Sequence, residues 1–195
     1  MEIYNGIPTF YAKSRAEWRQ WLELNHQKEK AIWLIIYRKG SEFSSVYYPE
    51  AVDEALCFGW IDSKPNKRDE NSYYQFFSKR NPKSNWSAVN KKKVAHLIDL
   101  DLMTSEGYEM IEIAKQNGTW DALDAVENIE IPTDLQVLFD NNETAFNHWN
   151  NFPRSSKRGI LEWILNAKKT ETRQKRIEET VTLAEQNIRA NHYRK

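Results

Sequence analysis

VDEALCFGWIDS, residues 52–63, contains the end of a predicted helix, a glycine and the start of a predicted strand. Pro49 lies just before it, and proline suits the first turn of a helix because an N–H there has no intrahelical partner. Gly59 can adopt the left-handed conformation that ends many helices. The stretch therefore predicts a helix that starts at Pro49 and ends at about Phe58, followed at once by a strand from Trp60 to Lys64.

The neighbouring segments extend this pattern in both directions. Ser14 is a good N-cap for a helix that runs to about His26. AIWLIIYRK, residues 31–39, is a short run of β-branched and aromatic residues, which favours a buried strand. Residues 73–80 predict another strand, joined to the one at Trp60 by a polar loop. The order α-β-α-β-β predicts an α+β fold with a small, mostly antiparallel sheet.

Beyond Pro82 the pattern is helical to the end of the chain. Ser84 or Asn85 can cap one helix, and Thr104 or Ser105 can cap another that ends before Gly118. Further helices are predicted over residues 133–139, 143–151, 155–168 and 170–190. The segment IEIP, residues 129–132, looks like a linker. We therefore expect an α+β domain over residues 1–130 and a helical region over 131–195.

A second block, FFSKRNPKSNWSAVN at residues 76–90, accompanies the first. Together they resemble the signature of the bacterial YdeI/OmpD-associated proteins, with Ser78 and Lys79 where Thr and Pro are usual. The resemblance continues through MTSEGYEMIEIAKQNGTWDALDAVE (103–127) and SSKRGILEWILNAKKTETRQKRIEETV (155–181). It therefore covers most of the chain in several blocks that follow the expected order.

That family has no settled enzymatic activity. Its names record an association with protection against bacteriocins or antimicrobial peptides and with an outer-membrane porin. The resemblance therefore implies a non-enzymatic binding or stress-protection protein, and nothing in the composition adds to this.

The cysteine content and the hydropathy of the sequence indicate in which cellular compartment the protein is expected. Cys57 is the one cysteine of the chain, which excludes an intramolecular disulfide and favours a reducing cytoplasm. No uncharged apolar stretch of about 18 residues occurs, so we expect neither membrane insertion nor secretion.

The net charge of zero hides strong segregation along the chain. Residues 64–93 carry nine Lys or Arg and two Asp or Glu, whereas residues 99–151 carry one and twelve. Such blocks can pair within the fold, or a basic patch can face solvent and attract acidic partners. The cations of the stretch 79–93, with Phe77 just before it and Trp86 within it, are typical of nucleic-acid binders. A nucleic-acid-binding helper is therefore one functional alternative, although zero net charge disfavours a nucleic-acid partner.

Aromatic residues supply the candidate ligand site. A sheet face with rings, one carboxylate and one guanidinium is typical of an apolar pocket wall with few polar anchors. The candidate ligand-binding residues, for an unidentified small molecule or peptide, are Trp60, Asp62, Tyr73, Phe77, Arg80 and Trp86. The alternative is that the rings are ordinary core and that Asp62 pairs with Arg80 or Lys64.

An enzyme of unknown reaction that uses Asp62, Arg80 or Cys57 is the second functional alternative. Cys57 lies near the C-terminal end of its predicted helix, where the helix dipole disfavours a thiolate, so we expect a buried structural cysteine. The four histidines, including His192, lack the spacing of a zinc site, and no phosphate-binding glycine motif is present. We therefore expect no metal and no cofactor. The sequence identifies neither catalytic residues nor an oligomeric state.

Overall fold

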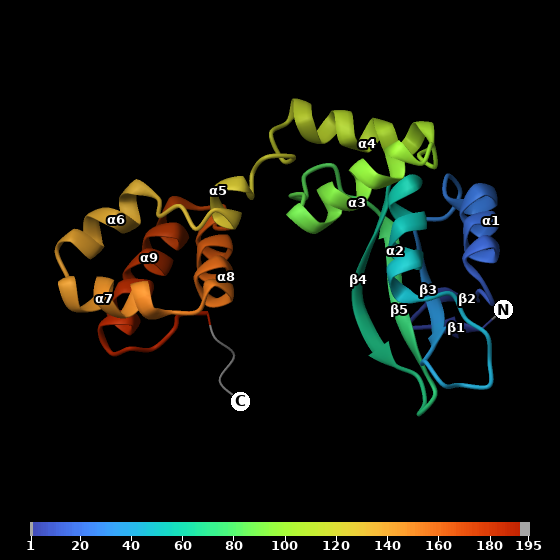
Figure 1. Ribbon diagram of the computed structural model, residues 1–195, viewed down its shortest axis with the longest axis horizontal. Helices are drawn as coiled ribbons and strands as arrows, with labels where there is room; N and C mark the ends of the chain where they lie inside the picture. The colour runs from blue at the N-terminus through green and yellow to red at the C-terminus, as the bar shows by residue number, and fades with distance from the viewer. Residues whose placement is uncertain (1, 192–195) are drawn as a thin grey trace. The chain divides into compact units, whose positions relative to one another are not determined.

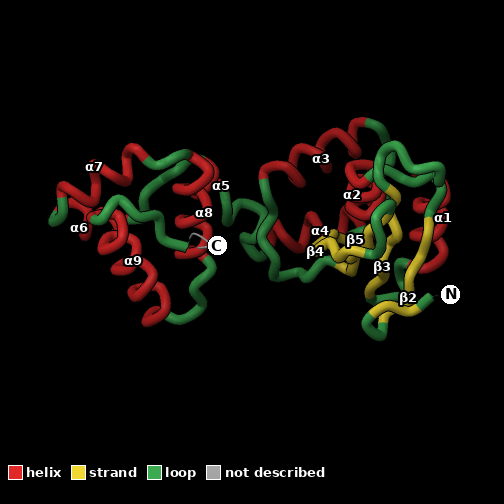
Figure 2. The backbone as a smooth tube through the Cα atoms, turned by 90° about the horizontal axis from the view of Figure 1, so that it is seen from below, coloured by secondary structure: helices red, strands yellow, loops and turns green. Residues whose placement is uncertain are grey.

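A computed structural model of the chain describes residues 2–191. The chain forms two compact units, Met1–Asp121 and Ala122–Lys195. The strands lie in the first unit, and the described residues of the second are helices and loops (Figures 1 and 2). The fold is thus α+β, as the sequence predicts. The expected boundary near residue 130 lies between two helices of the second unit, and stays a prediction of where the two parts separate in solution.

One five-stranded sheet forms the centre of the first unit, with strand order β1-β2-β3-β5-β4. Its strands are β1 (Ile3–Tyr4), β2 (Ile7–Tyr11), β3 (Ala31–Tyr37), β4 (Trp60–Lys67) and β5 (Ser72–Lys79). β2 and β3 pair in parallel and the other neighbours pair antiparallel, so the sheet is mixed but mostly antiparallel. β4 is an edge strand whose register shifts between Asp62 and Pro65.

Alternation along β3 gives the sheet two apolar faces. Ile32, Leu34 and Ile36 belong to the main core, which the helices cover. Trp33 and Ile35 belong to a smaller cluster on the other face, with Tyr74 of β5. Because both faces of β3 are buried, its sequence is a continuous run of hydrophobic residues and does not alternate.

Four helices complete the first unit: α1 (Arg15–Asn25), α2 (Tyr48–Cys57), α3 (Ala88–Asp99) and α4 (Ser105–Gln116). α2 runs alongside β4 and packs on α1 (Figure 1). Trp18 and Trp21 of α1 stack on each other, with ring centroids 5.2 Å apart. These indoles supply much of the apolar surface that α1 buries against the sheet.

Capping residues fix the ends of these helices. Ser14 accepts a hydrogen bond from the Glu17 N–H, as the sequence predicts. The Thr104 hydroxyl caps α4 and also donates to the carbonyl of Cys57, at 2.7 Å. A Cβ at Gly107 would lie 2.3 Å from that carbonyl oxygen, so glycine permits this close approach of α4 to α2.

The described part of the second unit, residues 122–191, contains five helices: α5 (Asp124–Glu127), α6 (Thr133–Asp140), α7 (Glu143–Asn151), α8 (Arg154–Leu165) and α9 (Thr170–Glu185). Their shared core is built on Phe139 and Trp149, which are almost fully buried. Arg173 of α9 donates two hydrogen bonds to the Asp134 carboxylate of α6, at 2.7 and 2.9 Å. Two parallel bonds of this kind fix both distance and orientation, so the pair sets how α6 and α9 meet.

The structure differs from the sequence prediction at both ends of the chain. The hairpin of β1 and β2 was not predicted. β1 has only two residues, and β2, with the sequence IPTFY, does not alternate strictly between apolar and polar residues. The last helix ends at Glu185 and not near Ala190, since Asn187 takes a positive φ of 58° that terminates it.

Candidate functional site

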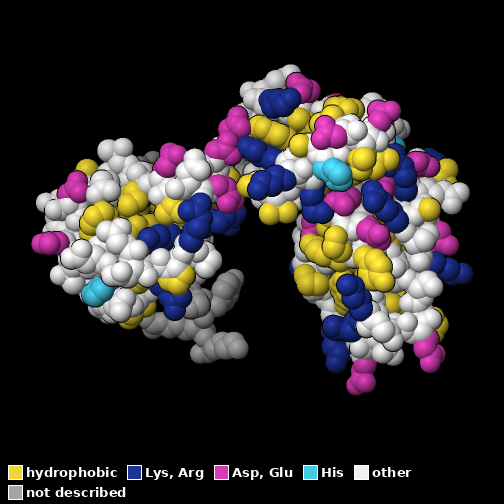
Figure 3. Space-filling view, in the orientation of Figure 1, with side chains coloured by type: hydrophobic (Ala, Val, Ile, Leu, Met, Phe, Trp, Pro, Cys, Tyr) yellow, Lys and Arg dark blue, Asp and Glu magenta, His cyan; other side chains and the backbone are white. Residues whose placement is uncertain are grey.

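A groove lies beside the N-terminal end of α2. The C-terminal ends of β3 and β4 and the N-terminal end of β5 form its floor. The groove consists of two adjacent cavities of about 670 and 560 Å³ that share Arg38, Tyr48 and Tyr73. The larger cavity also has Ser63, Pro65, Asn66, Lys67 and Gln75 in its wall. Figure 3 shows hydrophobic side chains beside Lys and Arg side chains over this part of the first unit. Cavities of this size suit small molecules.

Local sequence explains why the groove is open. α2 starts at Tyr48, and the Glu50 side chain accepts a hydrogen bond from the Tyr47 N–H at 3.2 Å, which fixes that start. The helix therefore leaves the sheet uncovered on the side of Tyr47. Opposite, the register shift before Pro65 bends the edge strand.

Asp62 positions one wall of the groove. Its carboxylate accepts a hydrogen bond from the Tyr48 hydroxyl at 2.6 Å. Burial, together with this hydrogen bond to Asp62, raises the pKa of the Tyr48 phenol. Tyr48 therefore keeps its proton near neutral pH, and its ring is held against the groove.

The polar groups of the larger cavity are few. Gln75 is buried, and its side-chain N–H donates to the Ser63 carbonyl at 2.8 Å. The Arg38 guanidinium lies over the Tyr73 ring, 6.0 Å from its centroid. An apolar wall with the fixed Gln75 amide and the Arg38 and Lys67 cations can orient a ligand.

The candidate residues from the sequence fall into separate places. Tyr73 lines the groove, and Asp62 supports it through Tyr48. Trp60 and Phe77 lie on the same side of the sheet but are 1% and 0% exposed, within the main core. Their rings meet Trp21 and Trp18 of α1 at centroid distances of 5.8 and 5.3 Å.

Arg80 and Trp86 form a third group. The Arg80 guanidinium lies 3.8 Å from the Trp86 ring centroid and donates to the Asn85 carbonyl at 2.6 Å. Burial lowers the pKa of Arg80 to about 10, and the Asp62 charge acts in the opposite direction. Arg80 also lines a separate cavity of about 390 Å³, together with Trp60, His26 and Glu106. The groove and this cavity share no lining residue.

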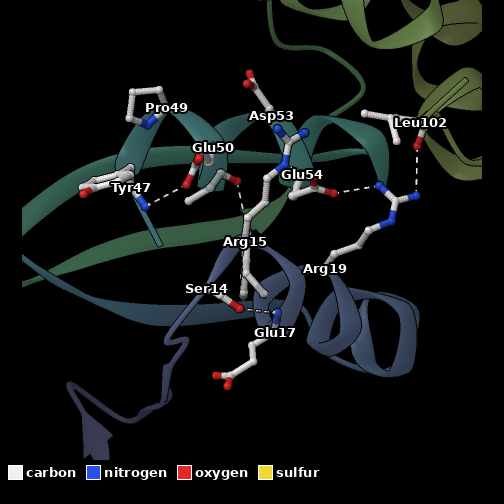
Figure 4. A network of polar contacts seen from close by, with 12 residues as sticks. Ser14, Arg15, Glu17, Arg19, Tyr47, Pro49, Glu50, Asp53, Glu54 and Leu102 are labelled. Atoms are coloured by element: carbon white, nitrogen blue, oxygen red, sulfur yellow. Dashed lines mark hydrogen bonds and ion pairs between the residues drawn. The ribbon is translucent and has the colours of Figure 1, made fainter. Parts of the chain in front are cut away.

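Cys57 lies in the core beside a buried ionic network. Burial raises the pKa of its thiol to about 11, so a thiolate is disfavoured. One turn earlier in α2, Glu54 is 2% exposed and accepts hydrogen bonds from Arg15 at 2.5 Å and from Arg19 at 2.7 Å (Figure 4). Arg19 also donates to the Leu102 carbonyl. This network joins α1, α2 and the segment before α4.

Several cations of the basic stretch 79–93 have partners within the fold. Lys79 donates to the Gln27 carbonyl at 2.8 Å. Lys91 pairs with Asp121 at 3.3 Å, and Lys93 with Asp53 at 2.5 Å. The two ion pairs join the basic block to acidic residues from other segments, which is the internal pairing that the charge pattern allows.

Sequence reasoning did not find Arg38, Tyr48 or Gln75. Strand alternation places Gln75 on the same face as Tyr73, and that signal could have added it to the site. Arg38 and Tyr48 come from the segments before and after a loop, so their approach to Tyr73 depends on tertiary structure.

Within residues 2–191, no group of three or more His, Cys, Asp or Glu side chains is arranged to hold a metal ion. His192 lies outside the described residues. No helix among those described has both the length and the apolar character needed to cross a membrane.

Comparisons with known proteins identify two matching families. The family described as "Domain of unknown function (DUF8412)" matches residues 10–110, and the family described as "Bacteriocin-protection, YdeI or OmpD-Associated" matches residues 128–187. The first match contains every lining residue of the groove, and the second falls in the helical unit. No curated protein and no solved structure matches the chain.

Proposed function

Because the chain belongs to the DUF8412 family and carries a bacteriocin-protection, YdeI or OmpD-associated domain, we propose that it is a non-enzymatic binding protein that protects a bacterial cell. Its ligand is a small molecule or a peptide, and the groove beside Tyr48 and Tyr73 binds it. Protection against bacteriocins or related stress is the role that the family name suggests.

The groove is the observation that carries this proposal. Its two cavities, of about 670 and 560 Å³, are lined mainly by rings and aliphatic stems, with a small number of polar groups. Tyr47 and Tyr48 are 51% and 40% exposed at its rim. Exposed rings that stand next to a cavity on a folded domain favour recognition over a role in the core.

The chemistry of the nearby titratable groups supports binding over catalysis. Burial and the hydrogen bond to Asp62 raise the pKa of the Tyr48 phenol and keep it neutral, and the Cys57 thiol is buried with a raised pKa. A general acid or base works best when its pKa lies near the operating pH. Neither group meets that condition.

Ligand binding by the full chain tests the proposal. A library of metabolites and short peptides is screened by thermal shift and by NMR against the wild type, Tyr48→Ala and Tyr108→Ala. Tyr108 lies on α4 and is 41% exposed, so it controls for the loss of an exposed ring outside the groove. We expect ligands that bind the wild type and the Tyr108 variant but not the Tyr48 variant. Ligands that bind all three proteins equally would place the function elsewhere.

The proposal places the protein in the cytoplasm. Its one cysteine is buried and unpaired, which fits a compartment that keeps thiols reduced. Fractionation of bacteria that express the chain from its own promoter is expected to recover it with the cytosol. Recovery from the periplasm would contradict this assignment.

A further inference from the structure

Arg38 differs from the other arginines within residues 2–191. Each of the other arginines within residues 2–191 donates at least one hydrogen bond from its guanidinium to an oxygen of the protein. Among the same residues, Arg38 forms neither a side-chain hydrogen bond nor an ion pair with a carboxylate, and its one close partner is the Tyr73 ring. A guanidinium presents five donors in a planar fork, so Arg38 has its hydrogen-bonding capacity available.

The larger cavity has an unbalanced charge. Arg38 and Lys67 line it, and no carboxylate does. Asp62 is the nearby acidic residue on β4, and its carboxylate already accepts the Tyr48 hydroxyl. The second cavity differs, because Glu50 lines it together with Lys39. The positive field is therefore concentrated in the larger cavity, where it favours an anion.

Three of the other residues that line this cavity offer flat apolar surfaces. Tyr48 and Tyr73 present rings, and Pro65 presents its aliphatic ring. A guanidinium that already lies over an aromatic ring can bind a carboxylate or phosphate with its edge. The cavity thus offers an apolar surface for the body of a ligand and a cation for its acidic group.

Peptide binding by strand addition is disfavoured at the adjacent sheet edge. β4 carries Lys64, Pro65 and Lys67, and its register shifts in the same segment. Charged residues, proline and bulges are the features that keep an edge strand from pairing with another chain. The face of the sheet, and not its edge, is therefore available for binding.

We propose that the larger cavity binds small organic acids: molecules with a flat apolar body against Tyr48 and Tyr73 and a carboxylate or phosphate on Arg38. This rests on the proposed function, because it names the class of ligand that the groove takes. Arg38 and Lys67 select the charge of the ligand, and the two tyrosines select its shape.

The test uses two probes of nearly the same shape, one with a charged carboxylate and one with a neutral amide in its place. 2-Naphthoate and the neutral 2-naphthamide are titrated into the full chain and followed by NMR and calorimetry. The variants are Arg38→Gln, Tyr48→Ala and, as a remote loss of one positive charge, Lys92→Gln on α3. We expect naphthoate to bind about 10-fold more tightly than naphthamide, because its carboxylate can accept charge-assisted hydrogen bonds from Arg38.

Each variant has a distinct expected result. Arg38→Gln removes most of the preference for naphthoate, with Lys67 still in the cavity wall, and leaves naphthamide binding unchanged, whereas Lys92→Gln alters neither affinity. Tyr48→Ala weakens both probes. Added salt weakens naphthoate alone, because an exposed cation is screened.

The possible negative results distinguish an incorrect ligand class from an incorrect binding site. Equal affinity for the two probes, with both still weakened by Tyr48→Ala, overturns the acidic ligand class and leaves the groove as a binding site. An aromatic acidic peptide that binds through Arg38 where naphthoate does not would overturn the small-molecule assignment. If neither probe binds, or if neither Arg38→Gln nor Tyr48→Ala changes the affinity, the ligand class is overturned. The same result counts against the groove as the binding site.

Discussion

The helix-covered face of β4 and β5 has two ends that differ sharply. At one end Trp60 and Phe77 are sealed beneath Trp21 and Trp18 of α1. At the other end Tyr73 stands beside an open groove. Both ends carry aromatic side chains on the same side of the same strands, so strand alternation does not distinguish them. Two features decide which rings are buried and which are accessible to a ligand: the part of the sheet that α1 covers, and the residue at which α2 begins.

Removing the sealed ring should have the largest effect. Trp60→Ala is expected to lower the free energy of unfolding by about 3 to 5 kcal/mol, because it leaves a cavity in a close-packed core. Tyr73→Ala, at the open end, should cost about 1 kcal/mol. Urea denaturation of both variants measures the difference. Equal losses would mean that the two ends are packed alike and that Tyr73 is structural.

Glu54 tests the polar part of the sealed end. Glu54→Gln is expected to cost about 1.5 to 3 kcal/mol, since it weakens the charge-assisted hydrogen bonds from Arg15 and Arg19. Both arginines remain partly exposed and can turn to water, which limits the loss. The control is Glu23→Gln, because Glu23 also pairs with Arg19 but is half exposed. That variant should cost at most about 0.5 kcal/mol. Similar losses at both positions would show that the network in Figure 4 contributes little.

Glu106, which lines the separate cavity beside Trp60, should give a pH-dependent effect. Its pKa is lowered from 4.5 to about 2 by the backbone N–H and by Gln27. A carboxyl whose pKa is lower in the folded state stabilises the protein above the unfolded value and loses that contribution as the pH falls. Glu106→Gln should therefore cost about 1 kcal/mol at neutral pH, and the cost should vanish between pH 4.5 and about 2. Glu109→Gln, at an exposed position of the same helix, is the control for the loss of one carboxylate, and a Glu106→Gln cost that persists at pH 2 would contradict the assignment.

The sequence predicted the framework of the first unit because its signals are local. Ser14 caps α1 as expected, and Gly59 ends α2 with a φ of 69°. β3 was predicted from one uninterrupted run of apolar residues. These elements depend on neighbours within a few positions, so periodicity and capping rules can reach them.

The site was predicted only in part, because its members meet through tertiary structure. Asp62 and Tyr73 were found from the alternation of two strands. Tyr48 and Arg38 were not, since neither carries a local sign that it approaches Tyr73. The exposure of each side chain could not be predicted either, because no pattern in the strands indicates that α1 covers Phe77 and leaves Tyr73 uncovered.

Asp62→Asn should have the smallest effect and is the sharpest test of how the open end is built. If Asp62 serves mainly to hold the Tyr48 hydroxyl, asparagine keeps an acceptor oxygen there, and the loss should be about 0 to 1 kcal/mol. Tyr48→Phe should cost a similar amount, and the double variant should cost less than the sum of the two, because both remove the same bond.

Arg80 provides the alternative outcome for the same variant. Its buried guanidinium is favoured by the Asp62 charge, so a loss well above 1 kcal/mol would mean that Asp62→Asn leaves the Arg80 charge uncompensated. Denaturation of Asp99→Asn, an exposed aspartate on α3, gives the baseline for losing one carboxylate. A small loss that is coupled to Tyr48 assigns Asp62 to the groove, whereas a large and uncoupled loss assigns it to the sealed end.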